Sequence, residues 1–376
     1  MPGQRKSNTG YNEPITLVGV GDISPNREDP PSIFRFCGDV FRKADIVFGQ
    51  MEAPLSDRGA PQFVPSRPAK LRANNISALT DEGAGFDVMS HAANHALDHG
   101  YEAFFDTIGE LTKHGIQVVG AGKDLEEARE PAIIERGGTE VGFLAYSSIL
   151  PIGHEAEEGV PGINPLRADH YYKQLNYQPG TPPLIVTKLV PEYREAMEEA
   201  IRNLRPRVDV LAVSIHSGVF GVPAMIAMYQ REAAYAAIDT GADLVLQHHA
   251  HILKGIEVYK GKIIFYGLGN FALEHALGYP GQPKPRDPGF AEYARLYPTN
   301  HADSNKTMIV KAYIQEKKIQ KVTYIPVLIN SNREPEVLEK KDPRAQEIFD
   351  YVKEISEAEN LNVRFSWDGD EVLITN

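Results

Sequence analysis

Short apolar runs alternate with amphipathic segments along most of the chain. Runs of strand length cover residues 15–22, 44–52, 86–95, 116–122, 131–136, 140–148, 208–216 and 243–251. Segments with helical periodicity cover residues 101–114, 190–205 and 223–242. Strands that alternate with helices predict a largely parallel sheet, and the paired runs at 256–270 and 307–329 predict antiparallel hairpins. The pattern therefore predicts an α/β sandwich.

Two segments interrupt this alternation. Residues 151–189 contain six prolines, and residues 275–306 are rich in proline, tyrosine and aspartate. Long segments without a pattern inside a compact domain are commonly lids over a functional site. We expect one domain over residues 13–330 with these two lid insertions. Residues 331–376 are expected to add a helix and a hairpin that pack on the same domain.

Composition and charge exclude several classes of protein. The 376 residues carry a net charge of −12 and no long basic run, which argues against a nucleic-acid partner. A single cysteine, Cys37, excludes an internal disulfide framework and suits a reducing compartment. Nowhere do about 18 apolar residues follow one another, so no membrane-spanning helix is expected. The polar N-terminus lacks the apolar core of a secretory signal, which makes the cytoplasm the expected location.

Polar residues follow five of the predicted strands at the point where each strand ends. They are Asp22, Glu52, the pair Asn94 and His95, His216, and the cluster of His248, His249 and His251. The carboxyl ends of parallel strands meet at one edge of a sheet, where ligands commonly bind. Oxygen and nitrogen donors without cysteine suit Mn²⁺, Zn²⁺ or Fe. The sequence thus predicts a site for one or two divalent metal ions at this edge.

Each of these residues also has an ordinary structural explanation. Asp22 could cap a turn, Glu52 could be a solvated loop carboxylate, and His216 could be a packed core residue. Their shared position at strand ends favours the metal site over these separate explanations. On an extended segment His249 and His251 point to one side, so His248 is expected to point away from the site.

Several motifs resemble the poly-gamma-glutamate synthesis protein CapA family, which belongs to the calcineurin-like metallophosphoesterase superfamily. The motifs are DIVFGQMEAPL (45–55), SHAANHALDHG (90–100), VSIHSG (213–218) and TGADLVLQHHAHILKGIEVYKGKIIFYGLGNF (240–271), with Gly21-Asp22 and IPVLI (325–329). The resemblance covers about residues 13–330. It implies the calcineurin-like metallophosphoesterase fold, in which two stacked β-sheets are flanked by helices.

The resemblance also implies roles for the residues at the strand ends. Asp22 and His251 would hold a first metal ion, and Glu52 would stand in the position of the bridging acid. The second ion would be held by Asn94, His216 and His249. His95 would act as proton donor or transition-state stabiliser, and Asp98 would orient it by hydrogen bonding.

The chain departs from the pattern of its relatives at several positions. The superfamily motif Asp-x-His reads Asp22-Ile23-Ser24 here, which leaves the first metal ion one ligand short. Ser217 follows His216 where a tryptophan is common, and Gln247 precedes the histidine cluster where a glycine is common. These changes indicate a reshaped pocket.

The resemblance and the residues together predict a metal-dependent hydrolase of a small-molecule or peptide-like anionic substrate. Its bond would be an amide, such as a gamma-glutamyl bond, or a phosphoester. Predicted substrate contacts are Arg67, Lys70, Arg72, Tyr171 and Tyr172, although basic loops and exposed tyrosines are common without a function. The alternative is a non-catalytic accessory or binding protein of poly-gamma-glutamate or capsule biosynthesis. A purely structural metal site is disfavoured, because such sites are usually closed by cysteine and histidine.

Overall fold

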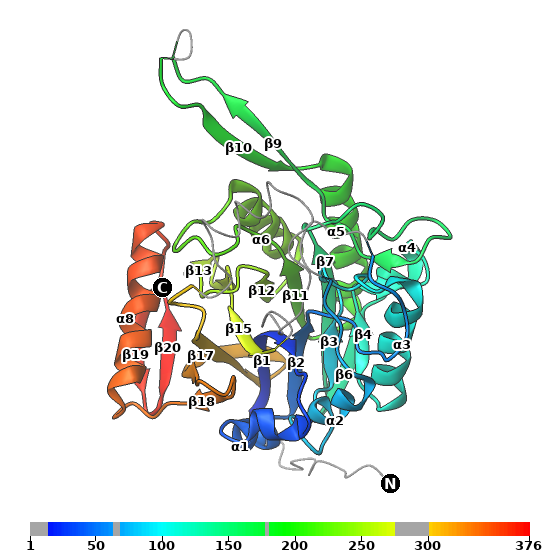
Figure 1. The fold of residues 1–376 in the computed structure, drawn as a ribbon. Coiled ribbons are helices and arrows are strands. Elements are labelled where there is room, and N and C mark those ends of the chain that lie inside the picture. Colours follow the sequence, from blue (N-terminus) through cyan, green and yellow to red (C-terminus); the bar gives the residue numbers. More distant parts are fainter. Residues whose placement is uncertain (1–13, 63–67, 177–179, 275–300) are drawn as a thin grey trace.

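The computed structural model describes residues 14–62, 68–176, 180–274 and 301–376 (Figure 1). The larger of its two main sheets has the strand order β19-β20-β17-β16-β1-β2-β3-β4, with β15 beside β1 and β18 beside β17. Its parallel strands are β1 (Ile15–Ser24), β2 (Ile46–Met51), β3 (Val88–Ser90), β4 (Gln117–Val119) and β15 (Asn270–Leu273). The others are β16 (Lys306–Gln315), β17 (Lys318–Ile329), β18 (Pro335–Val337), β19 (Arg364–Asp368) and β20 (Glu371–Thr375).

The second main sheet has the order β13-β14-β12-β11-β7-β6. Its strands are β6 (Ala132–Arg136), β7 (Thr139–Ser147), β11 (Val210–His216), β12 (Leu244–His248), β13 (Ile256–Tyr259) and β14 (Lys262–Phe265). Strands β7, β11, β12 and β14 run parallel, whereas β13 and β14 form the predicted hairpin. Its turn residues Lys260 and Gly261 both have positive φ, as a tight two-residue turn requires.

Helices flank the two sheets, and the last of them, residues 343–358, packs against β13 of one sheet and β17 of the other (Figure 1). They are α1 (Gly38–Lys43), α2 (Ile76–Leu79), α3 (Gly100–Lys113), α4 (Leu125–Ala128), α5 (Pro191–Leu204), α6 (Met228–Thr240) and α8 (Pro343–Ala358). Short 3-10 turns lie at Pro30–Phe34, Ala73–Asn75 and Arg205–Arg207. Among the helices that the structure describes, none is long and apolar enough to cross a membrane.

The main core lies between the two sheets. Phe48 of β2 and Phe143 of β7 stack across it with ring centroids 5.5 Å apart. A second cluster packs α1 and α2 on the outer face of the larger sheet, and a third packs α5 and α6 on the outer face of the other. The predicted α/β fold of two stacked sheets flanked by helices is therefore confirmed.

The segment 151–189 differs from its expected lack of regular structure. It contains β8 (Gly162–Ile163), which pairs with β5 (Ala121–Gly122), and the hairpin of β9 (Ala168–Lys173) and β10 (Leu184–Leu189). The prolines of the described part fall outside β9 and β10, so they do not interrupt the pairing. Most of the other predicted lid, residues 275–300, lies outside the described residues.

Candidate metal centre

The end of β1 is fixed by a close contact between two backbones. The amide of Asp22 donates a hydrogen bond to the carbonyl oxygen of Gly269 at 3.0 Å. A Cβ atom on Gly21 would lie 2.1 Å from that same oxygen, so only glycine fits beside Asp22. The contact sets Asp22 beside Asn270, its partner in the parallel pairing of β1 with β15. The carboxylate of Asp22 is consequently held in a fully buried position.

Glu52 lies between histidines from two different segments. Its Oε1 is 3.7 Å from Nε2 of His251, and its Oε2 is 3.8 Å from Nε2 of His216. Burial, with the nearby carboxylates of Asp22 and Asp98, raises the pKa of Glu52 well above its usual range. A carboxylate whose two oxygens face two separate groups of donors has the arrangement that a bridging ligand needs.

One group of donors lies on the Oε2 side of Glu52. Nε2 of His216 is 2.7 Å from Oδ1 of Asn94, and the rings of His216 and His249 have centroids 5.0 Å apart. Burial and the neighbouring histidine rings hold the pKa of His216 well below its usual range, and burial lowers that of His249 to about 3. Both imidazoles are therefore neutral at pH 7, which is the form that binds metal ions.

The other group lies on the Oε1 side. Nδ1 of His251 is 2.6 Å from Oδ1 of Asn270, whose Nδ2 donates to the carbonyl oxygen of Ser304 at 3.2 Å. Because Oδ1 of Asn270 is thus the acceptor, His251 carries its proton on Nδ1 and presents the lone pair of Nε2 to Glu52. Asn270 was not among the predicted site residues. The only signal for it was its place in the GLGNF motif.

The histidine cluster does not follow the alternation of an extended strand. Strand β12 ends at His248, and His249 and His251 have φ angles of 83° and 56°. The expectation that His248 points away from the site is wrong, because its Nδ1 lies 3.5 Å from Oδ1 of Asp22. Left-handed backbone in residues other than glycine is strained and is typical of functional sites.

His95 and Asp98 form a hydrogen-bonded pair at the edge of this centre. Nδ1 of His95 is 2.6 Å from Oδ2 of Asp98, which also accepts the amide of Ala69 at 2.7 Å. Burial opposes the charged form of His95, but the Asp98 carboxylate outweighs it, so the pKa of His95 is raised. His154 was missed by the sequence analysis. It is buried, and burial lowers its pKa, which the charge of Asp98 partly opposes.

The centre holds buried acidic groups whose oxygens have no hydrogen-bond partner among the described residues. Asp22, Glu52 and His216 each offer a ligand atom within 4.8 Å of the others. Within the described part of the chain, both oxygens of Asp22 and of Glu52 lack a hydrogen-bond partner, as do Nδ1 of His216 and of His249. Buried carboxylates without partners are rare in folded proteins. A divalent cation between Asp22 and Glu52 would satisfy the carboxylate oxygens, so the residues fit the predicted metal ion.

The predicted substrate contacts lie in different places. Arg67 lies outside the described residues. Lys70 is the next residue after Ala69, whose amide donates to Asp98. The Nζ of Lys70 donates to the carbonyl oxygen of Arg58 at 3.1 Å. Arg72 is exposed. Tyr171 and Tyr172 lie on β9, in the hairpin that projects from the body, and do not line the metal centre (Figure 1).

Two of the departures from the family pattern touch each other. The hydroxyl of Ser217 donates to Oε1 of Gln247 at 3.2 Å, and Nε2 of Gln230 donates to the same oxygen at 2.8 Å. These buried groups join the end of β11 to the end of β12 and to α6, behind His216. The altered positions therefore link the strands that carry His216 and His248 to α6.

Phe220 borders the centre from the loop between β11 and α6. Its ring centroid is 5.2 Å from that of His251 and 6.2 Å from that of His249. Two contacts fasten this loop to the segment after β12: Lys254 Nζ donates to the Val222 carbonyl, and the Gly221 amide donates to Ala250 O at 3.0 Å. Lys254 is almost fully buried, and that burial lowers its pKa to about 8.

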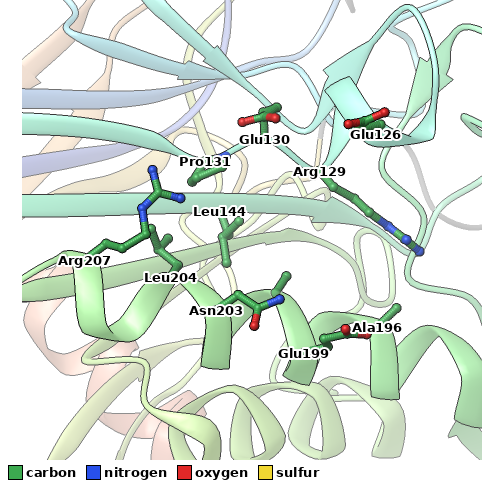
Figure 2. Close-up of a pocket in the computed structure, with 11 residues that line it drawn as sticks. Glu126, Arg129, Glu130, Pro131, Leu144, Ala196, Glu199, Asn203, Leu204 and Arg207 are labelled. Atoms are coloured by element: carbon green, nitrogen blue, oxygen red, sulfur yellow. The ribbon is translucent and has the colours of Figure 1, made fainter.

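A separate surface cleft of about 340 Å³ lies among α4, α5 and β7 (Figure 2). It shares no residue with the metal centre. Its lining mixes both signs of charge and comprises Glu126, Arg129, Glu130, Pro131, Leu144, Ala196, Glu199, Ala200, Asn203, Leu204 and Arg207.

The model of the family described as bacterial capsule synthesis protein PGA_cap matches residues 15–275. Among curated relatives, the PGA biosynthesis protein CapA of Bacillus subtilis is 28% identical over 304 residues, which are 77% of this chain and 70% of the relative. The capsule biosynthesis protein CapA of Bacillus anthracis is 27% identical over 325 residues, 83% of this chain and 70% of the relative. A probable polyglutamine synthesis accessory protein of Mycobacterium tuberculosis is 30% identical over 240 residues, 60% of this chain and 55% of the relative. The predicted family resemblance is confirmed.

Solved structures that align with most of the chain include two hydrolase-like proteins. The Thermus thermophilus sulfate thiohydrolase SoxB has a TM-score of 0.42 and 12% identity, and covers 92% of this chain and 61% of its own. The calcineurin-like phosphoesterase YfkN of Bacillus subtilis has a TM-score of 0.33 and 11% identity, and covers 93% of this chain and 99% of its own. Likeness at this level says nothing about the chemistry of the site.

Proposed function

The chain belongs to the bacterial capsule synthesis protein PGA_cap family, and from that premise we propose that its buried centre is the active site of a metal-dependent hydrolase. The observation that carries this proposal is the pair of buried acidic side chains, Asp22 and Glu52, whose oxygens have no hydrogen-bond partner among the described residues and lie beside His216 and His249. A resident divalent cation is the simplest group that makes such a cluster stable.

Two sets of ligands flank Glu52 in this proposal. Asp22 and His251 form one set and Asn94, His216 and His249 form the other, with Glu52 shared between them. When bound, one or two ions of Mn, Zn or Fe would lower the pKa of a water molecule and neutralise charge that develops on the substrate.

The other residues of the proposed site supply a proton to the substrate and exclude water from the metal ligands. His95 has a raised pKa and an Asp98 partner on Nδ1, so Nε2 is the atom that would donate a proton to the leaving group. Asp98 fixes the orientation of the ring, and the Ala69 amide in turn fixes Asp98. Phe220 provides an apolar wall beside His249 and His251, which would exclude water from the ligands on that side.

We propose a small anionic substrate with an amide bond, such as a gamma-glutamyl bond, or with a phosphoester bond. The printed functions of the Bacillus relatives, in PGA and capsule biosynthesis, favour the gamma-glutamyl amide. Lys70 stays a prediction as an anion contact, since its Nζ donates to the carbonyl oxygen of Arg58. Arg67, Arg72, Tyr171 and Tyr172 stay predictions, and Tyr171 and Tyr172 have the weakest support because they lie on the projecting hairpin.

A non-catalytic accessory role is the second candidate. The mycobacterial relative is described as a probable synthesis accessory protein, which favours this reading. The hydrogen-bonded pair of His95 and Asp98 argues against it, because a binding protein does not need an oriented proton donor beside its metal ligands.

The test combines metal analysis with a substrate panel. Wild-type protein purified without chelator would be assayed on phosphoesters and gamma-glutamyl amides beside His95→Ala and His249→Ala. We expect bound metal in the wild type, loss of metal in His249→Ala, and loss of turnover with metal retained in His95→Ala. Metal in the wild type with no turnover on any member of the panel would favour the accessory role. A wild type without metal, matched by both variants on every substrate, would remove the hydrolase proposal.

A further inference from the structure

The hairpin of β9 and β10, here called the arm, projects from the body of the molecule (Figure 1). Its base is anchored on α6: Leu189 donates its amide to Oε2 of Glu232 at 2.9 Å, and Tyr229 donates its amide to Oγ1 of Thr187 at 3.2 Å. The strands pair with each other and with no other strand of the described residues. A two-stranded hairpin without packing is at best marginally stable in water, so the outer half of the arm lacks the support that its base has.

The outer half of the arm exposes large apolar side chains. Tyr172 is 67% exposed and stands opposite Ile185, which is 56% exposed. Tyr171 is 47% exposed, on the other face of the ribbon, and Leu184 is 40% exposed on that same face. Leu175, beyond the end of β9, is 61% exposed. Both faces of the ribbon are therefore apolar, whereas contact with one flat protein surface would require only one apolar face.

The charge of the arm has the opposite sign to that of the chain. In the chain of net charge −12, the described residues 168–176 and 180–189 hold Lys173 and Lys188 against the single acid Asp169. Asp169 stands opposite Lys188 at the base, which leaves Lys173 as the charge of the outer half, opposite Leu184. A lysine among tyrosines and aliphatic side chains is the composition found at the interface of a membrane with anionic headgroups.

The length of the arm suits such a contact as well. Beyond the anchored Thr187, residues 171–173 of β9 and 184–186 of β10 span about 10 Å at about 3.3 Å per residue. That length exceeds the Debye length of about 8 Å at physiological ionic strength. The arm can therefore touch a negative surface while the acidic body stays beyond the range of strong repulsion.

We propose that the arm is a docking element for an anionic lipid surface. Tyr171, Tyr172, Leu184 and Ile185 enter the headgroup region, and Lys173 contacts the lipid phosphates. The unpaired strand edges remain hydrated at that depth, so no backbone group has to enter the hydrocarbon core. The contact is peripheral and involves no membrane span. It is independent of the proposed hydrolase, because the arm holds none of the metal ligands.

The test is flotation of the full chain with vesicles. Phosphatidylcholine vesicles, with and without phosphatidylglycerol, would be compared at low and high salt. The variants are the apolar pair Leu184→Ser with Ile185→Ser, and separately Lys173→Glu. The matched control is Ile152→Ser, which changes an apolar residue that is fully exposed outside the arm. We expect binding to the anionic vesicles that weakens with salt, falls at least tenfold in both arm variants, and is unchanged in the control.

Three results would overturn the proposal: no binding of the wild type to anionic vesicles, equal binding to neutral vesicles, or full binding by the arm variants. Sedimentation velocity in the absence of vesicles can give a fourth result that overturns it. If the wild type is a dimer and the arm variants are monomers, the arm contacts a second copy of the chain instead. Metal content and thermal unfolding of each variant verify that it is folded. They also separate a failure of this proposal from a failure of the hydrolase proposal, which the arm substitutions leave untouched.

Discussion

The two oxygens of the Glu52 carboxylate face different numbers of possible metal ligands. On the Oε2 side, Asn94, His216 and His249 offer three donors, and the His95–Asp98 pair lies next to Asn94 in the chain. On the Oε1 side, Asp22 and His251 offer two, and Ser24 stands where the superfamily pattern has a histidine. If the proposed function holds, this difference predicts two neighbouring metal positions of unequal strength, with the ion on the Oε2 side bound more tightly.

The weaker side has support that the sequence did not reveal. Asn270 fixes the tautomer of His251, and Nδ1 of His248 lies 3.5 Å from Oδ1 of Asp22. His248 is fully buried, and neither ring nitrogen has a hydrogen-bond partner among the described residues. Its position allows it to orient Asp22, which would offset in part the ligand that Ser24 does not supply.

The largest effect is expected from Glu52→Gln, which tests whether the two sides share a ligand. The neutral amide cannot neutralise either ion, so binding on both sides should fail and turnover should drop on the order of 10³-fold. Calorimetric titration with Mn²⁺ of chelator-treated protein measures both sites. The exposed Glu126→Gln is the matched control. Retention of one site at wild-type affinity would show that Glu52 is not shared.

Next in size is the contrast between His216→Ala and His251→Ala. His216→Ala should abolish the tighter binding event and reduce turnover to background, whereas His251→Ala should remove only the weaker event. The same Mn²⁺ titration gives the stoichiometry and affinity of each. The reverse order of effects would contradict the inequality of the two sides.

A smaller effect is expected from Asn270→Ala. Loss of the acceptor for Nδ1 of His251 should weaken the Oε1 side by about 10- to 100-fold, the range measured for residues that orient metal ligands. The affinity of the other side should not change. Asn270→Asp keeps the acceptor oxygen and serves as the control, so equal losses in both variants would argue for a general disturbance of β15.

The smallest effect is a change in pH dependence in Asp98→Asn. Burial alone would lower the pKa of His95, but the Asp98 carboxylate raises it by more than burial lowers it. The proton-donating form of His95 therefore persists to higher pH in the wild type. Without the negative charge the pKa of His95 should fall, and the alkaline limb of the kcat profile should move to lower pH. A limb that stays in place, with metal content unchanged, would mean that His95 is not the proton donor.

Sequence patterns predicted most of the fold because most strands are continuous apolar runs. The run at residues 15–22 became β1, and the run at 208–216 became β11, whose last residue is His216. The hairpin at 168–189 was missed because its strands are exposed, so burial leaves no alternating apolar pattern in them. The six prolines around it also indicated a loop.

Within the site, the sequence argument brought together the polar residues that lie at or near the ends of strands. Asp22, Glu52 and His216 converge as that argument requires. It failed for His248, because the alternation of strand residues ends where His249 takes up a positive φ. It also missed Asn270 and His154, which reach the centre only through tertiary packing. No local pattern reveals such contacts.

The central claim is that Glu52 lies between two sets of metal ligands, and anomalous diffraction from a crystal soaked in Mn²⁺ tests it most directly. We predict anomalous density within bonding distance of Oε2 of Glu52, Asn94 and His216, and at lower occupancy beside Oε1, Asp22 and His251. The absence of density at Glu52 in a fully soaked crystal, with the same side chains in place, would contradict the account.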